Sequence, residues 1–167
     1  MTVKKVKTLG DFSLYQPAKE VTEFGAPLES DICDMIDTMR HYNGVGLAAN
    51  QIGIDKRIIT LEVHNNPRYP NQLEVPLMVL VNPQINFIGD KQDVFWEGCL
   101  SLPGLRGEVS RYCNIEYEAY DHLGNFLSTQ ASGFIARIIQ HEYDHLQGVL
   151  LHQRLGDLTK FGFENNL

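Results

Sequence analysis

The sequence lacks a long hydrophobic run, an excess of positive charge and an even set of cysteines. No window approaches ~18 consecutive apolar residues, so no segment is expected to span a membrane. The chain has 14 Lys and Arg against 21 Asp and Glu, and its net charge of -7 argues against nucleic-acid binding by phosphate neutralisation. Three cysteines, without an apolar signal segment in residues 1–10 (MTVKKVKTLG), favour the reducing cytoplasm.

Repeats, low-complexity runs and interdomain linkers are missing too. The only linker-like stretch, residues 64–71 (HNNPRYPN), is too short to separate domains. The chain of 167 residues is 43% hydrophobic and 21% charged, as in an ordinary globular domain. We therefore expect a single domain, residues 1–167, whose core needs no metal or disulfide, so that any bound metal serves chemistry.

The order of the expected elements predicts the α+β fold class. Apolar residues recur at helical spacing behind Glu29, Ser30 and Asp31, which predicts a helix over residues 29–42. Residues 57–63, 76–87 and 114–121 are β-rich, which predicts short, mostly antiparallel strands. A second helix follows Ser132 and Gly133 and ends at Gly148. Strands between two helices, without βαβ alternation, are typical of α+β proteins.

A His-Glu-x-x-His pattern lies within the second expected helix, in residues 140–148 (QHEYDHLQG). Residues four apart lie about one turn apart on one helix face, so His141 and His145 can point at one metal ion. Glu142 would lie beside the ion and take a proton from a bound water. A helix with two partly exposed histidines and a solvated glutamate would show the same letters, since short motifs also occur by chance.

The third ligand must come from another segment. Downstream, only His152 and Glu164 could serve, and neither has support from a motif. Upstream, Cys99 lies between glycine and leucine in an expected loop, and its thiolate would complete a site with one open position. A small buried hydrophobic residue is the alternative for Cys99, and we expect it for Cys33 and Cys113. A Cys/His nucleophilic pair is another alternative, which would not require two histidines at helical spacing.

A glycine-rich stretch, residues 44–53 (GVGLAANQIG), follows the first helix. Gly44 and Gly46 allow a ligand to approach the backbone, and the amide of Gln51 could face a developing oxyanion. Taken alone, the stretch is better explained as a helix C-cap followed by a tight turn. It does not continue as a dinucleotide-binding fingerprint.

Three segments, in this order and at these separations, resemble the signature motifs of the peptide deformylases: GVGLAANQIG, EGCLSLPG (97–104) and QHEYDHLQG. The likeness extends to residues 104–112 (GLRGEVSRY) and 131–140 (ASGFIARIIQ), so it covers nearly the whole chain. The resemblance implies hydrolysis of the N-formyl group from the initiator formyl-methionine of nascent polypeptides, with release of formate. The strands would then pack around a central metal-binding helix.

The resemblance also assigns roles to residues. It implies that Fe(II), replaceable by nickel, cobalt or zinc, is held by Cys99, His141 and His145, and that Glu142 activates the metal-bound water. The side chain of Gln51 and the backbone N–H of Leu100 would stabilise the oxyanion.

The substrate would contact further residues around this site. The resemblance suggests that Val45 and Gly46 pair with the backbone of an extended peptide. Phe134 and Ile138 share a helix face with His141 and are candidate walls of the methionine pocket, although core packing explains them equally well. A solvated helix face is the preferred interpretation of Arg137.

Two charge patterns complete the sequence interpretation. Glu97 and Arg111 could form an ion pair that orients the segment around Cys99. Residues 149–167 have two basic and two acidic residues and lack the long basic C-terminal helix of some bacterial relatives. We therefore expect at most weak ribosome association. Phe161, Phe163 and Leu167 are expected to pack back on the domain.

Two other functions remain open from the sequence. A zinc endopeptidase could use the same helix, although it would need a downstream third ligand. A paralogue that binds metal or peptide ends without turnover is the non-enzymatic alternative. Cleavage of formyl-blocked but not internal peptide bonds separates the first from a deformylase, and formate release separates the second.

Overall fold

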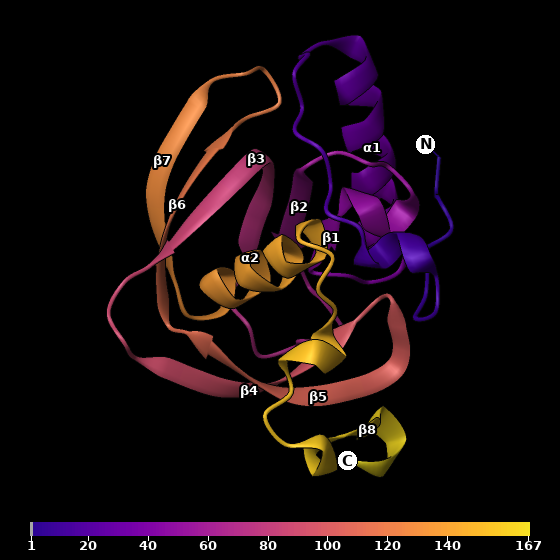
Figure 1. The fold of residues 1–167 in the computed structure, drawn as a ribbon, viewed down its shortest axis with the longest axis vertical. Helices are drawn as coiled ribbons and strands as arrows, with labels where there is room; N and C mark the ends of the chain where they lie inside the picture. The colour runs from indigo at the N-terminus through magenta and orange to yellow at the C-terminus, as the bar shows by residue number, and fades with distance from the viewer. Residues whose placement is uncertain (1) are drawn as a thin grey trace.

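The structure, a computed structural model, describes residues 2–167 and contains two α-helices and two antiparallel sheets within them (Figure 1). The helices are α1 (Ala26–His41) and α2 (Gly133–Leu146). The strands are β1 (Gly46–Ala48), β2 (Ile58–Val63), β3 (Val75–Phe87), β4 (Gln92–Cys99), β5 (Leu102–Tyr112), β6 (Asn114–Tyr120), β7 (Phe126–Ser132) and β8 (Phe161–Phe163). One sheet has the order β1-β2-β3-β6-β7 and the other β4-β5-β8.

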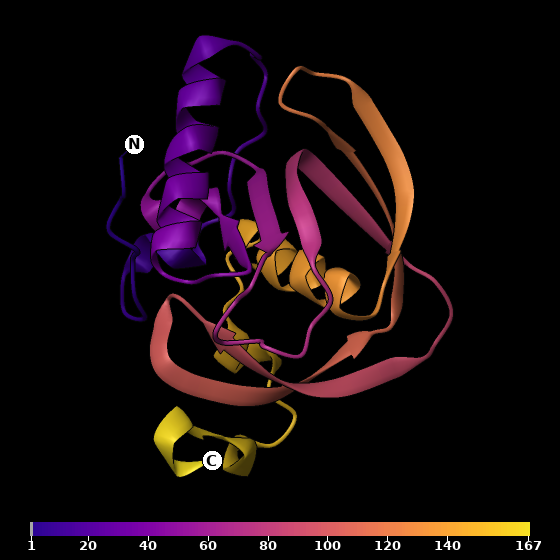
Figure 2. The same cartoon turned by 180° about the vertical axis from the view of Figure 1, so that it is seen from behind.

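Helix α2 lies between the two sheets, and α1 lies on the opposite side of β1 and β2 (Figures 1 and 2). The neighbouring residues Ile58 and Ile59 of β2 point to opposite faces of the sheet, as the period of a strand requires. Ile58 packs with Met35 and Met39 of α1, whereas Ile59 packs with Ile139 of α2. Both faces are therefore covered, which explains the nearly continuous apolar run of residues 57–63.

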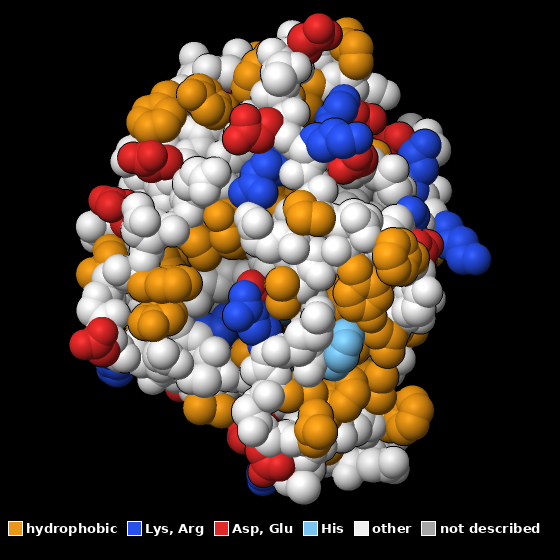
Figure 3. Space-filling model, viewed as in Figure 1, with side chains coloured by type: hydrophobic (Ala, Val, Ile, Leu, Met, Phe, Trp, Pro, Cys, Tyr) orange, Lys and Arg blue, Asp and Glu red, His pale blue; other side chains and the backbone are white. Residues whose placement is uncertain are grey.

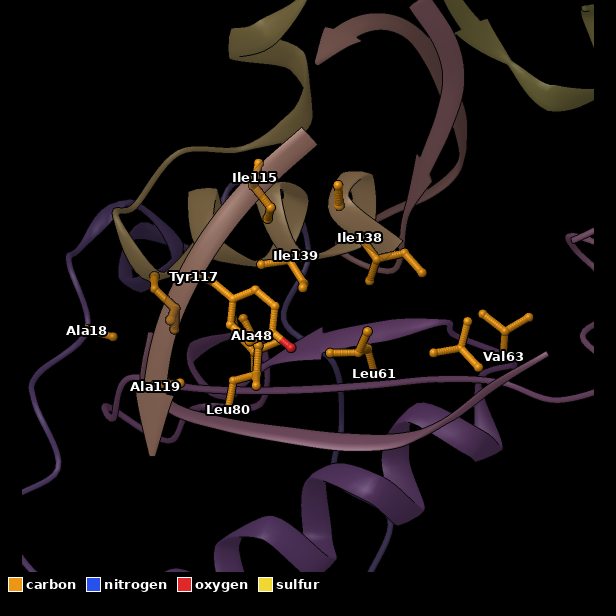
Figure 4. Packing of buried hydrophobic residues seen from close by; sticks show 14 residues of the cluster. Ala18, Ala48, Leu61, Val63, Leu80, Ile115, Tyr117, Ala119, Ile138 and Ile139 are labelled. Atoms are coloured by element: carbon orange, nitrogen blue, oxygen red, sulfur yellow. The ribbon is translucent and has the colours of Figure 1, made fainter. Parts of the chain in front are cut away.

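The core around α2 fixes the position of the helix. Ile138 and Ile139 pack against Leu61, Leu80 and Tyr117 of the larger sheet (Figure 4). The helix ends before Gly148, whose φ of 74° lies in the left-handed region that glycine adopts without strain. The expected start after Ser132 and end near Gly148 are confirmed.

The expected first helix is displaced by three residues at its start. Helix α1 begins at Ala26, after Gly25, and has a proline in its first turn, where proline loses no helical hydrogen bond. The expected burial of two cysteines is wrong: Cys33 is exposed on α1, and Cys113 is only half-buried between β5 and β6.

The three expected strands correspond to β2, β3 and β6, and every strand pairing among the described residues is antiparallel. The expectation that Cys99 lies in a loop is wrong, because Cys99 is the last residue of β4. Strands β4 and β5 form a long hairpin whose register shifts between Gly98 and Cys99. The end of β4 lies next to α2, where Cys99 contacts His145.

The tail returns to the domain, as expected. Strand β8 pairs with β5, and Phe161 packs beside Leu151 and Leu155. Phe163 and Leu167, expected to pack as well, remain exposed. Among residues 2–167, neither α1 nor α2 has the length and the apolar character of a membrane-spanning helix.

Candidate metal centre and active site

One cysteine and two histidines converge where the end of β4 meets α2. The Sγ atom of Cys99 lies 3.2 Å from Nε2 of His145, and one ligand atom from each of Cys99, His141 and His145 lies within 4.8 Å of the others. All three side chains are buried. The i, i+4 spacing on α2 brings the imidazoles together, and the β4–β5 hairpin brings the thiol to them.

This donor set fits a transition-metal ion. One thiolate and two imidazoles match a site with three protein ligands and one open position. The Nδ1 atom of His141 lies 2.9 Å from Oε2 of Glu97, so the carboxylate fixes the tautomer that leaves Nε2 available. His152 and Glu164 are not part of this cluster: Glu164 pairs with Arg106 instead.

Glu97 is the centre of a buried charge network behind the ligands. Its carboxylate accepts hydrogen bonds from Arg111 at 2.7 and 2.9 Å and from Arg137 at 2.7 Å. Burial would raise the pKa of Glu97, but the bond to His141 and the Arg111 charge hold it well below its ordinary value. The expected Glu97–Arg111 pair is present.

The interpretation of Arg137 as part of a solvated helix face is wrong, since its side chain is buried. Besides Glu97, it donates to the carbonyl of Asp93 at 2.6 Å and of Val109 at 3.1 Å. Three acceptors from β4 and β5 thus satisfy the buried guanidinium of Arg137. The amphipathic spacing of the helix alone would place this residue at the surface.

The network reaches the surface on the other side of α2. Asp144 accepts a hydrogen bond from Arg111 at 2.8 Å and pairs with the half-exposed Arg154. These three residues line a depression, and Figure 3 shows basic side chains within a hollow on this face. A chain of ion pairs therefore supports the helix that carries both histidines.

The ligand environment favours a thiolate. Burial alone would raise the pKa of Cys99, but the neighbouring imidazoles of His145 and His141 more than offset this and hold it well below its usual range. For His141, burial opposes the charged form, while hydrogen bonds to Cys99 and Glu97 raise its pKa. A metal ion competes with protons for the lone pairs of this thiolate and these imidazoles.

Glu142 lines a cleft together with Cys99 and His141 but does not belong to the three-residue cluster that could hold a metal. Burial raises the pKa of its carboxyl, while the two histidines partly counter that effect. Its Oε2 atom is buried and has no hydrogen-bond partner among residues 2–167. Gly46 of β1 faces it so closely that a Cβ atom there would lie 2.5 Å from Oε1 of Glu142. This carboxylate is therefore positioned to accept a proton in the cleft.

Gln51 is buried beside Cys99. Its Oε1 accepts from the backbone N–H of Ala48 at 2.9 Å, which leaves Nε2 directed toward Ser101 Oγ at 3.1 Å and Cys99 Sγ at 3.8 Å. An amide donor next to the ligand cluster can stabilise negative charge on a reacting oxygen. Leu100 lines the same cleft in the turn between β4 and β5.

The remaining predicted contact residues all line this cleft. Val45 and Gly46 form one side and Phe134 and Ile138 another. Among residues 2–167, β1 is an edge of the five-stranded sheet, so its outer backbone groups are free of a strand partner there.

Sequence reasoning missed Arg68, Tyr69 and Phe95, which also line the cleft. The ring of Tyr69 lies 5.1 Å from that of Phe134. The sequence signal for Arg68 and Tyr69 is the PRYP sequence within residues 64–71, in which two prolines flank these residues. On the sequence alone, this stretch resembles only a linker.

Comparison with known proteins gives concordant matches in sequence and structure. The family model described as polypeptide deformylase matches residues 3–161. "Peptide deformylase 1" of Nitrosomonas europaea is 45% identical over 166 residues, which cover 99% of this chain and 94% of that protein.

Solved structures agree. The class I type b peptide deformylase of Acinetobacter baumannii bound to Met-Ala-Ser is 38% identical, with a TM-score of 0.89 and coverage of 92% of this chain and 99% of that one. Peptide deformylase from Thermotoga maritima is 36% identical, with a TM-score of 0.85 over 94% of this chain and 100% of that one. With its three motifs gathered around one cleft, this chain belongs to the polypeptide deformylase family.

Proposed function

We propose that residues 1–167 act as a single catalytic domain that removes the N-formyl group from formyl-methionyl polypeptides, with Glu142 as the general base. Membership of the family supports the reaction. The observation that carries the assignment of residues is the convergence of Cys99, His141 and His145 near Glu142, whose buried Oε2 has no hydrogen-bond partner among residues 2–167.

A metal ion held by Cys99, His141 and His145 would supply Lewis acidity toward the formyl oxygen and make a water more acidic. We infer Fe(II) as the native ion from the family resemblance, with nickel, cobalt or zinc able to replace it. The mixed thiolate and imidazole set suits Fe(II) and zinc alike and does not choose between them.

Glu142 takes the proton of the attacking water and passes it to the departing amine. Its raised pKa supports this role, because the carboxylate of a strongly acidic group would be too weak a base to take the proton from water. Gln51 Nε2 and the backbone N–H of Leu100 donate to the oxygen that becomes negative when the formyl carbon turns tetrahedral.

The rest of the cleft positions the substrate. The free edge of β1 at Val45 and Gly46 suits backbone pairing with an extended peptide. Phe134 and Ile138 offer an apolar wall for the methionine side chain. The Met-Ala-Ser bound to the Acinetobacter baumannii relative is the peptide that such a reaction would leave, which supports this substrate class.

We propose the cytoplasm as the compartment, since formylated nascent chains are made there and the Cys99 thiolate needs a reducing environment. Its partners are then formyl-methionyl nascent peptides, with at most weak ribosome association and no direct contact with nucleic acid or membrane.

Formate release from formyl-Met-Ala-Ser by anaerobically purified protein, with metal analysis of the same sample, tests the proposal. We expect formate in proportion to bound metal, loss of activity with a chelator, and no cleavage of internal peptide bonds in an unblocked peptide. Internal cleavage would favour the endopeptidase, and a fully metallated protein that releases no formate would favour the non-catalytic alternative.

A further inference from the structure

The loop between β2 and β3, residues 64–74, contributes Arg68 and Tyr69 to the lining of the cleft. Asn66 ties it to one wall by donating to the carbonyls of Asn43 and Gly44 at 3.0 and 3.3 Å. Asn66 also accepts from the backbone N–H of Arg68 at 2.9 Å, which sets the direction of the next residues. The loop thus places Arg68 in a defined position although it belongs to no helix or strand.

Arg68 extends from this loop to the opposite wall. A Cβ atom on Gly98 would lie 2.6 Å from Nη2 of Arg68, so the guanidinium lies against the backbone of β4 next to Cys99. Its Cζ lies 5.9 Å from the centre of the Tyr69 ring, whose edge borders the cleft. A side chain at position 98 would displace the end of the Arg68 guanidinium from this place.

Arg68, Tyr69 and Phe95 line both the catalytic cleft and a second groove that adjoins it. The second groove continues past Trp96 and Arg106 along the β4–β5 hairpin. A peptide with its formyl end at the ligand cluster can leave the cleft along this groove, and its path then passes Arg68.

Arg68 differs from the other cations along this path in its charge balance. Arg137 pairs with Glu97 at 2.7 Å, and Arg106 pairs with Glu164 at 2.6 Å. Arg68 forms no ion pair with any carboxylate of residues 2–167. It therefore presents an uncompensated positive charge on a chain whose net charge is -7.

We propose that Arg68 is a specificity-determining residue that favours formyl-methionyl peptides with an acidic side chain downstream of the methionine. The inference rests on the proposed function, because it assumes that the formyl end lies at the ligand cluster. A carboxylate on the departing part of the peptide supplies the ion-pair partner that Arg68 lacks among residues 2–167.

The test compares C-terminally amidated formyl-Met peptides that carry either Glu or Gln at the second, third or fourth position. We expect kcat/KM to favour Glu at one or more of these positions by roughly two- to fivefold, the range of exposed ion pairs, mainly through KM. The preference should shrink in 0.5 M salt, because added ions screen an exposed pair.

Variants assign the preference to the guanidinium. Arg68→Gln should abolish it, Arg68→Lys should keep part of it, and Arg68→Glu should shift the preference toward peptides with Lys. Lys91→Gln, which removes the same charge from the exposed turn between β3 and β4, should leave it unchanged. Glu164→Gln, which releases Arg106 in the same groove, should strengthen it.

Equal kcat/KM values for Glu and Gln peptides at all three positions would overturn the proposal. A decrease of kcat/KM in Arg68→Gln that is the same for all peptides and insensitive to salt would overturn it as well. Either result leaves the proposed function intact, since the peptides are still deformylated. If the metal-loaded protein released formate from none of the formyl peptides, the proposed function itself would be refuted.

Discussion

At the scale of single residues, the three cysteines separate by environment. Only Cys99 is buried beside two imidazoles, whereas Cys33 is exposed and Cys113 half-buried. We predict that Cys99→Ser removes most bound metal and nearly all activity, while Cys33→Ser and Cys113→Ser keep both. Metal content per chain after desalting measures this, and full occupancy in Cys99→Ser would refute its role as a ligand.

Gly46 controls the position of Glu142 through simple exclusion. An added Cβ would lie 2.5 Å from Oε1 of Glu142 and 2.8 Å from Cγ2 of Ile138, so these side chains must shift. We predict that Gly46→Ala lowers kcat by about 10²-fold, the cost of a misplaced catalytic group, with unchanged metal content.

Gly156→Ala is the matched control for this substitution, because a Cβ at position 156 meets no atom within 4 Å. It should leave kcat unchanged. Wild-type turnover in Gly46→Ala would show that Glu142 is not held in place by contact with β1.

At the scale of elements, α2 could be predicted well and the β4–β5 hairpin could not. Helix α2 shows its apolar periodicity and its terminating Gly148 in consecutive residues. The hairpin contains glycines at 98, 104 and 107 and a proline at 103, which weaken the alternating pattern of a strand. Its identity depends on cross-strand pairing, which no local window contains.

The sequence likewise predicts some contacts of the buried charged residues and not others. The pairing of Glu97 with Arg111 could be suggested from the neighbouring motif, but the burial of Arg137 could not. Arg137 meets Glu97 across 40 positions of sequence, and only the packing of α2 on β4 brings them together. The position of Arg68 likewise depends on a loop that crosses between two elements.

The elements β4 and α2 are linked through Glu97, which makes their contact sensitive to acid. The pKa of Glu97 lies below its ordinary value of 4.5, so the folded protein holds this carboxylate ionised more strongly than the unfolded chain does. A depressed pKa contributes stability above pH 4.5, and this contribution is lost as the pH falls toward the folded-state pKa.

We therefore predict that Glu97→Gln lowers the free energy of unfolding at neutral pH, and that the difference from wild type narrows below pH 4.5. Urea unfolding of metal-free protein at several pH values measures this, because a metal ion on His141 would add its own proton linkage. A difference that stays constant with pH would contradict the account.

At the scale of the whole molecule, the tail closes on the domain, and two of its four charged residues form ion pairs with the domain. Arg154 pairs with Asp144, and Glu164 pairs with Arg106. A segment that docks on ribosomal RNA needs clustered positive charge, which residues 149–167 do not provide.

We predict weak association with ribosomes that changes little with salt, and activity on free formyl peptides without ribosomes. Sedimentation with ribosomes at low and moderate salt is the measurement. Tight binding that weakens steeply as the salt concentration rises would show that the protein docks on ribosomal RNA after all.

The central claim is that Glu142, beside an ion held by Cys99, His141 and His145, performs the proton transfers of deformylation. Formate release from formyl-Met-Ala-Ser, measured for wild type and Glu142→Gln at equal metal content, tests it most directly. The account predicts that the variant binds metal normally but loses turnover by at least about 10²-fold, as expected for a general base. Near-normal turnover in a fully metallated Glu142→Gln protein would contradict it.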